Sequence, residues 1–387
     1  MKKKILKDDW LSHPSIHYLS TVFQRSGYEI LFVGGCIRNT ILKKKVNDVD
    51  IATAATPEEI IKICKKNNIK AIPTGIKHGT ITIIIDEKTY QITTFRIDEK
   101  NDGRHANVKF TDSLELDASR RDLTINALYC DVDGKIIDPL KAFGDLRLGI
   151  VRFIGDPNKR ILEDHLRILR FFRFYALYGD KKKNLNPTAL EACKKHQKKL
   201  KKISKERVTF EVKKLLAASH PISTIKNMDK INILDQIIGN CEIGPFIKYV
   251  DFEQKYKIQI SWLGRLLSLQ NNADYKMILL TKKENRIITK LNEAVFLNVD
   301  PIEFSYYNGI ELGLIYSLLQ NSFEKRELNK SLINQISSMN KNLFPVKAAD
   351  LGPKYHGKEI GNKLYELESK WIKSKFKLSK AQLLRMI

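Results

Sequence analysis

The stretch "LFVGGCIRNTILKKKVNDVDIAT", residues 31–53, decides the expected fold of the N-terminal part of this chain. An apolar strand leads into a double glycine, a short helix follows, and a second strand contains two aspartates separated by one residue. Gly34 and Gly35 allow a tight turn and let backbone amides approach an anion at the positive end of the helix. Arg38, on the first turn of that helix, can hold phosphates.

The alternating aspartates predict a metal site. In a strand, residues i and i+2 point to the same face, so Asp48 and Asp50 would place two carboxylates side by side. A cation must offset their repulsion, and Mg²⁺ takes one or two protein carboxylates and completes its shell with water and substrate phosphates. Either motif alone is common. The ordered combination of a phosphate cradle, a basic clamp and a metal pair predicts nucleotidyl transfer.

Composition bounds the class of protein. The chain has 387 residues, of which 43% are hydrophobic, enough for two or three globular domains. No apolar run approaches the roughly 18 residues that cross a bilayer, and the N-terminus is too polar for a signal peptide, so we expect a cytoplasmic protein with no membrane partner. The five cysteines are scattered without a CxxC pair, which argues against a zinc site.

The positive charge is concentrated in the C-terminal part. The formal net charge is +24, and residues 151–387 account for 44 Lys and Arg against 24 Asp and Glu, an excess of 20. The densest run, "KKHQKKLKKISKER", spans residues 194–207. A solvated helix face could carry such a run, but the whole excess favours a nucleic acid partner, which would bind through counterion release. A membrane surface is the weaker alternative because the run lacks an aromatic and leucine-rich face.

The hydrophobic pattern changes near residue 155. Before it, short β-rich runs such as "HGTITIIID" alternate with helical stretches such as "TPEEIIKICKKNN", which begins with a Thr cap and a Pro. After it, apolar residues recur at spacings of three and four, as in "NKRILEDHLRILRFFRFYALYG". The sequence therefore predicts an α+β protein, with a mixed N-terminal domain and an all-helical remainder.

Five motifs together resemble one known family. They are "GGCIRN…DVDIAT", "TGIKHGTITI", "TTFRID…DGRH", "SRRDLTINA" and "EDHLRILRFFRF". In order and spacing they resemble class II tRNA nucleotidyltransferases, the CCA-adding enzymes, which share the polymerase β-like superfamily with bacterial poly(A) polymerases. The resemblance is strong over residues 30–175 and extends more loosely to "DLGPKYHGKEIGNKLYELESKW". It implies a catalytic head at 1–155, a base-selecting neck at 156–215, and a tRNA-binding body and tail at 216–387.

The resemblance also implies residue roles. Asp48 and Asp50 would be the catalytic, metal-binding carboxylates, Asp122 would brace a neighbouring arginine, and Glu163 would orient the base-selecting pair. Arg104, in "DGRH", would belong to a flexible loop that is needed for the switch from C to A addition. The implied nucleotide contacts are Gly35, Arg38, Arg121, Asp164, Arg167, Arg170 and Arg173.

Asp164 and Arg167 have a chemistry of their own. Three residues apart on an expected helix, they would share one face, and an intrahelical salt bridge is the ordinary outcome of such a pair. Cytosine and adenine, however, each present an amino donor beside an unprotonated ring nitrogen. A carboxylate can accept from the amino group while a guanidinium donates to the ring nitrogen, so this pair could select C and A. Guanine and uracil would be rejected.

The predicted activity is template-independent, Mg²⁺-dependent addition of CCA to the 3′ end of tRNA from CTP and ATP. The alternatives are a CC-adding or A-adding enzyme, a bacterial-type poly(A) polymerase and, least favoured, a non-catalytic RNA-binding protein. Two features depart from the family: Asn39 follows the motif arginine where Asp is common, and the helical half has no His-Asp dipeptide of a fused phosphohydrolase domain. The sequence assigns no third metal ligand and is compatible with a monomer or a homodimer.

Overall fold

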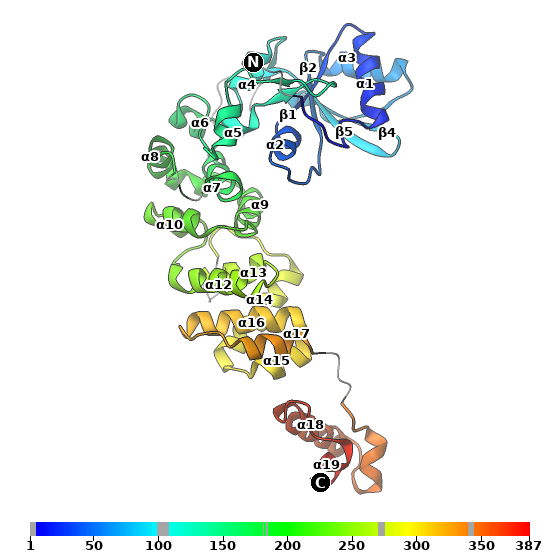
Figure 1. Ribbon diagram of the computed structural model, residues 1–387, viewed down its shortest axis with the longest axis vertical. Helices are drawn as coiled ribbons and strands as arrows, with labels where there is room; N and C mark the ends of the chain where they lie inside the picture. The colour runs from blue at the N-terminus through cyan, green and yellow to red at the C-terminus, as the bar shows by residue number, and fades with distance from the viewer. Residues whose placement is uncertain (1–4, 99–107, 181, 183–184, 270–274, 340–343) are drawn as a thin grey trace. The chain divides into compact units, whose positions relative to one another are not determined.

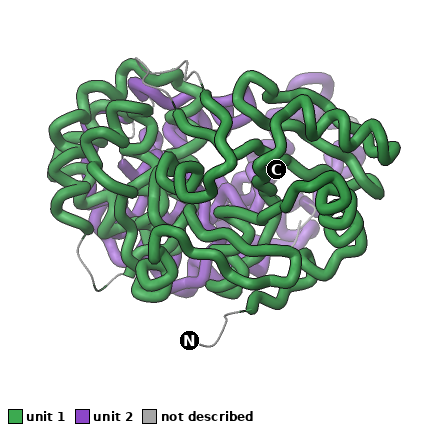
Figure 2. The backbone as a smooth tube through the Cα atoms, turned by 90° about the horizontal axis from the view of Figure 1, so that it is seen from above, with its two compact units in different colours: residues 1–237 green, residues 238–387 purple. Residues whose placement is uncertain are grey.

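The computed structural model describes residues 5–98, 108–180, 182, 185–269, 275–339 and 344–387. The chain divides into two compact units, residues 1–237 and 238–387, which Figure 2 shows in different colours. Each unit is described by itself. The division into a catalytic head, a neck, and a tRNA-binding body and tail stays a prediction.

A mixed seven-stranded sheet organises the N-terminal part of the first unit (Figure 1). The strand order is β3-β4-β5-β2-β1-β8-β9, in which β2 runs parallel to β5 and antiparallel to β1. A separate two-stranded ribbon joins β6 to β7. The strands are β1 (Ile30–Val33), β2 (Asp50–Thr53), β3 (Lys70–Gly75), β4 (Thr80–Ile85), β5 (Lys88–Thr94), β6 (Arg96–Asp98), β7 (Val108–Phe110), β8 (Tyr129–Cys130) and β9 (Ile136–Ile137).

The apolar pattern of the sequence explains the sheet and its helices. All four residues of β1 are buried, as expected for a strand at the centre of a sheet that is covered on both faces. The predicted helix start at Thr56 is confirmed: Thr56 and Glu59 form a capping box around Pro57. The helices of this part are α1 (Pro14–Gln24), α2 (Gly35–Ile41), α3 (Pro57–Lys66), η1 (Ile76–His78), α4 (Leu114–Ser119), η2 (Thr124–Asn126) and α5 (Phe143–Arg147).

Helices complete the first unit. Phe171 and Phe172 of α7 are fully buried, and the Phe171 ring stacks on Phe153 at 5.4 Å, which joins the helices to the end of the sheet domain. These helices are α6 (Pro157–Glu163), α7 (Arg167–Tyr178), α8 (Pro187–His196), η3 (Gln197–Lys202), α9 (Lys205–Leu216), α10 (Ile222–Lys230) and α11 (Ile233–Ile237).

The single helix expected across "EDHLRILRFFRF" is wrong. Asp164 has an extended backbone, with φ −152° and ψ 111°, so α6 ends at Glu163 and α7 begins at Arg167. The Asp164 carboxylate accepts a hydrogen bond from the Leu166 amide at 3.0 Å, which stabilises the new helix start in competition with the continued helix. Asp164 and Arg167 therefore do not lie three apart on one helix face.

All the regular secondary structure among the described residues of the second unit is helical. An ion pair between Arg265 and Glu253, 2.6 Å long and about 1% exposed, is buried within it. The sheet of the first unit and the helices of both units confirm the predicted α+β class with a helical remainder. In the described part of the chain, no helix is both long and apolar enough to cross a membrane. The helices are α12 (Ile243–Tyr256), α13 (Trp262–Leu269), α14 (Lys282–Leu297), α15 (Pro301–Asn308), α16 (Ile310–Phe323), α17 (Lys330–Ser337), η4 (Ala348–Lys354), α18 (Lys358–Lys373) and α19 (Lys380–Leu384).

Candidate active site

A polar cleft of about 660 Å³ opens in the first unit, and eight arginines and five carboxylates line it. Such an excess of guanidinium groups suits a polyanionic ligand. The cleft brings together most of the residues that the sequence singled out, although they come from β2, α2, the segment after α4, α6 and α7. They are Gly34, Gly35, Arg38, Asp50, Arg121, Asp122, Glu163, Asp164, Arg167, Arg170 and Arg173.

The glycine turn forms one end of the cleft. Gly34 has φ +75°, a conformation in which a side chain is strained, and a β-carbon there would lie 3.9 Å from the Arg121 guanidinium. Gly35 follows as the first residue of α2. The turn predicted from the double glycine is therefore present, and it brings backbone close to a second cleft arginine.

Arg38 is held between aromatic rings. Its guanidinium lies 4.3 Å from the Tyr178 ring centre and 5.0 Å from that of Phe174, and it donates to the Tyr178 hydroxyl at 3.0 Å and to the Asn126 amide oxygen. Burial lowers the pKa of Arg38, while Tyr178 opposes the shift. Its Nε is buried without a hydrogen-bond acceptor among the described residues. This Nε–H is therefore a donor that no described residue satisfies.

Asn39 contributes a neutral acceptor beside that arginine. Its side-chain oxygen accepts from Arg38 at 3.3 Å and from the Tyr178 hydroxyl at 3.1 Å. Asn39 therefore keeps the hydrogen-bond acceptor that the family's Asp would offer, without placing a negative charge beside Arg38.

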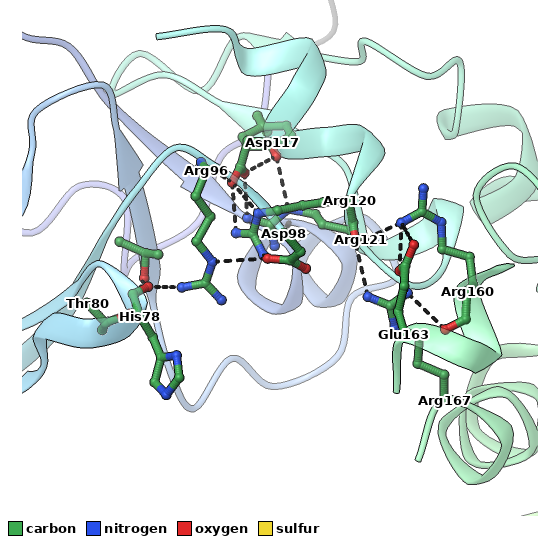
Figure 3. Close-up of polar contacts among 12 residues, drawn as sticks. His78, Thr80, Arg96, Asp98, Asp117, Arg120, Arg121, Arg160, Glu163 and Arg167 are labelled. Atoms are coloured by element: carbon green, nitrogen blue, oxygen red, sulfur yellow. Dashed lines mark hydrogen bonds and ion pairs between the residues drawn. The ribbon is translucent and has the colours of Figure 1, made fainter. Parts of the chain in front are cut away.

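Arg121 and Asp122 have different partners from those expected. Arg121 donates to Asp117 at 3.0 Å and to the Tyr129 hydroxyl at 2.9 Å (Figure 3 shows the Asp117 contact), and Asp122 pairs with Arg170. The prediction that Asp122 braces Arg121 is wrong. Adjacent side chains diverge here because Asp122 bonds to its own neighbouring backbone, the Leu123 amide, at 2.8 Å.

Asp50 is the first residue of β2, and Asp48 lies just before the strand. Both side chains are exposed. Partial removal from water raises the pKa of Asp50, the Asp48 charge raises it further, and Arg121 and Arg38 oppose the shift. Two carboxylates therefore act on each other at the edge of an arginine-rich cleft, although Asp48 precedes the strand on which it was expected.

Asp48 and Asp50 are the two carboxylates that could bind a metal ion at the start of β2. Among the described residues, no cluster of three or more His, Cys, Asp and Glu side chains is suited to hold a metal ion. Two oxygen ligands still fit Mg²⁺, which takes most of its ligands from water and substrate phosphates.

Arg167 and Asp164 both face the cleft, but each pairs with another side chain. Arg167 pairs with Glu163, which also binds Arg160 at 2.9 Å, and Asp164 pairs with Arg207 of α9 at 2.7 Å. Glu163 thus contacts Arg167 directly, and its expected role in orienting the base-selecting residues stays a prediction.

A second contact fixes the same arginine. Arg167 donates to the backbone oxygen of Arg120 at 3.1 Å, so α7 is tied to the sheet domain beside the Asp117 pair, as Figure 3 shows. Arg167 is only 9% exposed, so these contacts hold a buried guanidinium at one edge of the cleft.

Arg170 and Arg173 share an acidic partner that the sequence did not single out. Glu211 of α9 is 2% exposed, and its carboxylate lies 2.8 Å from Arg173 and 3.9 Å from Arg170. Burial raises the pKa of Glu211, and the two arginines oppose that shift. Arg207 and Glu211 lie four residues apart on α9, and this spacing could have predicted from the sequence that α9 presents a polar face.

Arg104 lies outside the described residues. The role implied for its loop stays a prediction.

The sequence matches two known domain families. Residues 30–152 match the poly A polymerase head domain, and residues 184–242 match the probable RNA and SrmB binding site of polymerase A. The first match covers the sheet domain with the glycine turn and both aspartates, and the second includes the lysine-rich run.

Similar proteins extend this likeness over nearly the whole chain. The chain is 32% identical over 384 residues to the mitochondrial CCA tRNA nucleotidyltransferase 1 of Danio rerio, covering 95% of this chain and 88% of the relative. It is also 32% identical to a CCA-adding enzyme of Ligilactobacillus salivarius, covering 90% and 89%.

Solved structures agree with the fold. The Bacillus stearothermophilus CCA-adding enzyme in complex with CTP superimposes with a TM-score of 0.70 at 25% identity, over 97% of each chain. The Thermotoga maritima enzyme complexed with tRNA reaches a TM-score of 0.71 at 19% identity, over 99% of this chain and 98% of that one, and supports the fold alone.

Proposed function

The chain belongs to the CCA-adding tRNA nucleotidyltransferases, and from this premise we propose that its arginine-rich cleft adds C, C and A to the 3′ end of tRNA, using CTP and ATP. One observation carries the assignment of the site. A single cleft joins a glycine turn, an arginine whose Nε has no hydrogen-bond partner among the described residues, one of two neighbouring carboxylates, and the side chains of Asp164 and Arg167. These are the parts that nucleotidyl transfer without a template requires.

The triphosphate would bind at the glycine end of the cleft. Arg38 and Arg121 present guanidinium groups there, each held by protein partners, and Gly35 keeps the backbone accessible. Side chains that are already oriented lose little freedom when they bind a phosphate, so the α-phosphorus is held in a reactive position.

The base would be read at the α6–α7 junction. The Asp164 carboxylate keeps accepting capacity beyond Arg207, and Arg167 keeps donors beyond its contacts with Glu163 and backbone oxygens. Together they fit the amino group and ring nitrogen that cytosine and adenine share. Because the helix breaks at Asp164, its carboxylate is freed from the helix face on which a direct salt bridge would form.

Arg170 and Arg173 would complete nucleotide binding from α7. Their pairing with Asp122 and Glu211 neutralises part of the charge and fixes both guanidinium groups. They lie in the cleft beside Arg167, consistent with the expected contact to the nucleotide.

Asp48 and Asp50 would hold the divalent cation, for which we propose Mg²⁺. When bound, the ion lowers the pKa of the RNA 3′-hydroxyl and offsets negative charge on the phosphoryl oxygens. The RNA 3′-hydroxyl gives its proton to water, its oxygen forms a bond to the α-phosphorus, the bond from that phosphorus to the bridging oxygen breaks, and pyrophosphate leaves. The arginines balance the negative charge that the leaving group develops.

The remaining domains would bind tRNA. We propose the division predicted from the sequence: head at 1–155, neck at 156–215, and body and tail at 216–387. The exposed lysines around η3, such as Lys198 and Lys199, supply the positive charge that a phosphate backbone attracts. Cytoplasmic location and the choice between monomer and homodimer stay predictions.

A direct assay separates the candidate activities. Purified protein is incubated with tRNAs ending at the discriminator base, at C and at CC, with each labelled nucleoside triphosphate singly and then together, and Asp50→Asn serves as the control. Ordered gain of C, C and A, absent in the variant, is expected. Gain of C alone or of A alone indicates a CC-adding or A-adding enzyme, a long A tail indicates a poly(A) polymerase, and no incorporation contradicts enzymatic function.

A further inference from the structure

Asp50 borders a second cavity besides the cleft. This cavity measures about 640 Å³, and its lining includes Asp48, Asp50 and Gln91, with Trp10 and Tyr90 as aromatic residues. Asp50 therefore borders both hollows of the first unit, whereas Asp48 borders only the second.

Their charges point to different occupants. Eight arginines line the cleft, whereas the described residues around the second cavity include no arginine and one lysine, Lys88. A triphosphate carries too much negative charge for the second cavity, which already contains two carboxylates. A nucleoside with a single phosphodiester, the form of an RNA 3′ end, suits its one lysine and the Trp10 ring that borders it.

The geometry of phosphoryl transfer separates the reactants in the same way. The attacking and leaving oxygens lie roughly in line on opposite sides of the phosphorus. With the pyrophosphate bound among the arginines of the cleft, the attacking 3′-hydroxyl would approach from the side away from them. Of the two hollows that Asp50 borders, the second cavity is the one whose described lining has no arginine.

Gln91 is a polar residue of the cavity lining that lies next to Asp50 in the sheet. It is the register partner of Asp50 across the parallel strands β2 and β5, so the two side chains point to the same face with a strand spacing of about 4.8 Å. Its side chain is exposed and forms no hydrogen bond with the described residues. An amide can donate to a ribose oxygen and accept from a hydroxyl without adding charge beside Asp48 and Asp50.

We propose that the second cavity receives the 3′-terminal nucleoside of the tRNA and that the Gln91 amide hydrogen-bonds its ribose, which positions the 3′-hydroxyl for attack. The inference rests on the proposed function, because it concerns the second substrate of the same reaction. It adds a substrate-binding residue and a site for the acceptor end.

A binding cycle without turnover tests the proposal. Affinities of wild type, Gln91→Ala and Gln91→Leu are measured by fluorescence anisotropy for tRNA ending in CC, with a normal or a 3′-deoxy terminal ribose, in the absence of nucleoside triphosphates. Gln24→Ala, at an exposed position of α1, is the matched control. CTP affinity is measured by calorimetry for each protein.

Wild type and Gln24→Ala should bind the normal tRNA about fivefold more tightly than the 3′-deoxy tRNA, the usual effect of one hydrogen bond. Both Gln91 variants should bind the two tRNAs equally and keep wild-type affinity for CTP, which also reports that the cleft is folded. A ratio unchanged by Gln91 substitution, no dependence on the hydroxyl in wild type, or weakened CTP binding in the variants would overturn the proposal. CTP binding and nucleotide incorporation by wild type test the proposed function separately.

Discussion

The guanidinium of Arg170 in α7 pairs with the carboxylate of Asp122, which lies 48 residues earlier in the chain, in the segment between α4 and η2. This pair joins the sheet domain to the helix that carries three cleft arginines. Asp122 is 7% exposed, and it also accepts from the Asn126 side chain at 3.0 Å. Asn126 in turn accepts from Arg38, so Arg38 and helix α7 are joined by one hydrogen-bond network.

Asp122→Asn should lower the stability of the first unit by about 1–2 kcal/mol at pH 7, because it removes the nearer of the two carboxylates beside Arg170, a half-buried arginine whose other partner, Glu211, lies 3.9 Å away. Trp10 fluorescence during urea unfolding reports this, in a Trp262→Phe, Trp371→Phe background that removes the other two tryptophans. Asp133→Asn, at an exposed turn, is the control and should change stability by less than about 0.5 kcal/mol.

The effect should depend on pH. Burial alone would raise the pKa of Asp122, but Arg170 and the hydrogen-bond donors around it hold that pKa well below its usual range. A depressed pKa stabilises the folded state above the unfolded-state pKa of about 4, and this contribution is lost as the pH falls further. The difference in free energy of unfolding between wild type and Asp122→Asn should therefore stay constant from pH 7 to about 5 and shrink below about 4. A stability difference that grows as the pH falls would contradict the view that the Asp122–Arg170 ion pair stabilises the fold.

Asp50→Asn should reduce CMP incorporation at least about 100-fold, because it removes one of the two carboxylates proposed to hold the metal ion. CTP affinity, measured by calorimetry without tRNA, should change by less than about threefold, since the arginines of the cleft remain. Loss of CTP binding together with incorporation would instead place Asp50 in folding or nucleotide binding.

Asp164→Asn should weaken base selection. An asparagine amide can turn its donor or its acceptor toward the base, so the ratio of kcat/KM for CTP to that for UTP should fall about tenfold or more. Single-turnover incorporation with each nucleotide measures the ratio. Arg147→Ala, at an exposed position of α5, should leave it unchanged. An unchanged ratio in Asp164→Asn would assign base selection to other residues.

Arg38→Lys should raise the dissociation constant for CTP about tenfold although the charge is kept. Lysine cannot reproduce the planar fork that binds Asn126 and Tyr178 while stacking on Phe174, and one such set of contacts is worth about 1–2 kcal/mol. Calorimetric titration checks this, with Arg25→Lys at the end of α1 as the control. Equal affinity of wild type and Arg38→Lys would show that charge alone matters there.

The lysines around η3 should contribute to tRNA affinity. Replacing Lys198 and Lys199 by glutamine should weaken binding and make the plot of log affinity against log salt less steep by about 1–2, the slope change expected for two lost phosphate contacts. Lys65→Gln with Lys66→Gln, at the exposed end of α3, removes the same charge from another surface. Equal losses in the two double variants would indicate a general effect of net charge.

Local features were predictable from the sequence. The turn at Gly34, the Thr56 cap and the approximate position of Asp50 at a strand follow from contacts within a few residues, where backbone preference and hydrophobic period suffice. The change from a mixed sheet to helices near residue 155 follows from the same periodicity.

Partners across the fold were not predictable in this way. Asp122 pairs with Arg170 and not Arg121, and Asp164 pairs with Arg207 and not Arg167. Each ion pair depends on which segments pack against each other. The sequence spacing alone would allow several charged partners for each of these aspartates. Even the break at Asp164 depends on a local hydrogen bond competing with helix continuation.

By itself, the sequence determined the two-part α+β architecture, the family resemblance and the types of residue that gather around the site, because these depend on periodicity and local motifs. Only the tertiary structure decided which guanidinium meets which carboxylate, that Asp50 borders two cavities, and that Gln91 lies beside it. The physical reason is that a strand or helix start is set by neighbouring residues, whereas a site is set by long-range packing that brings distant segments within hydrogen-bond distance.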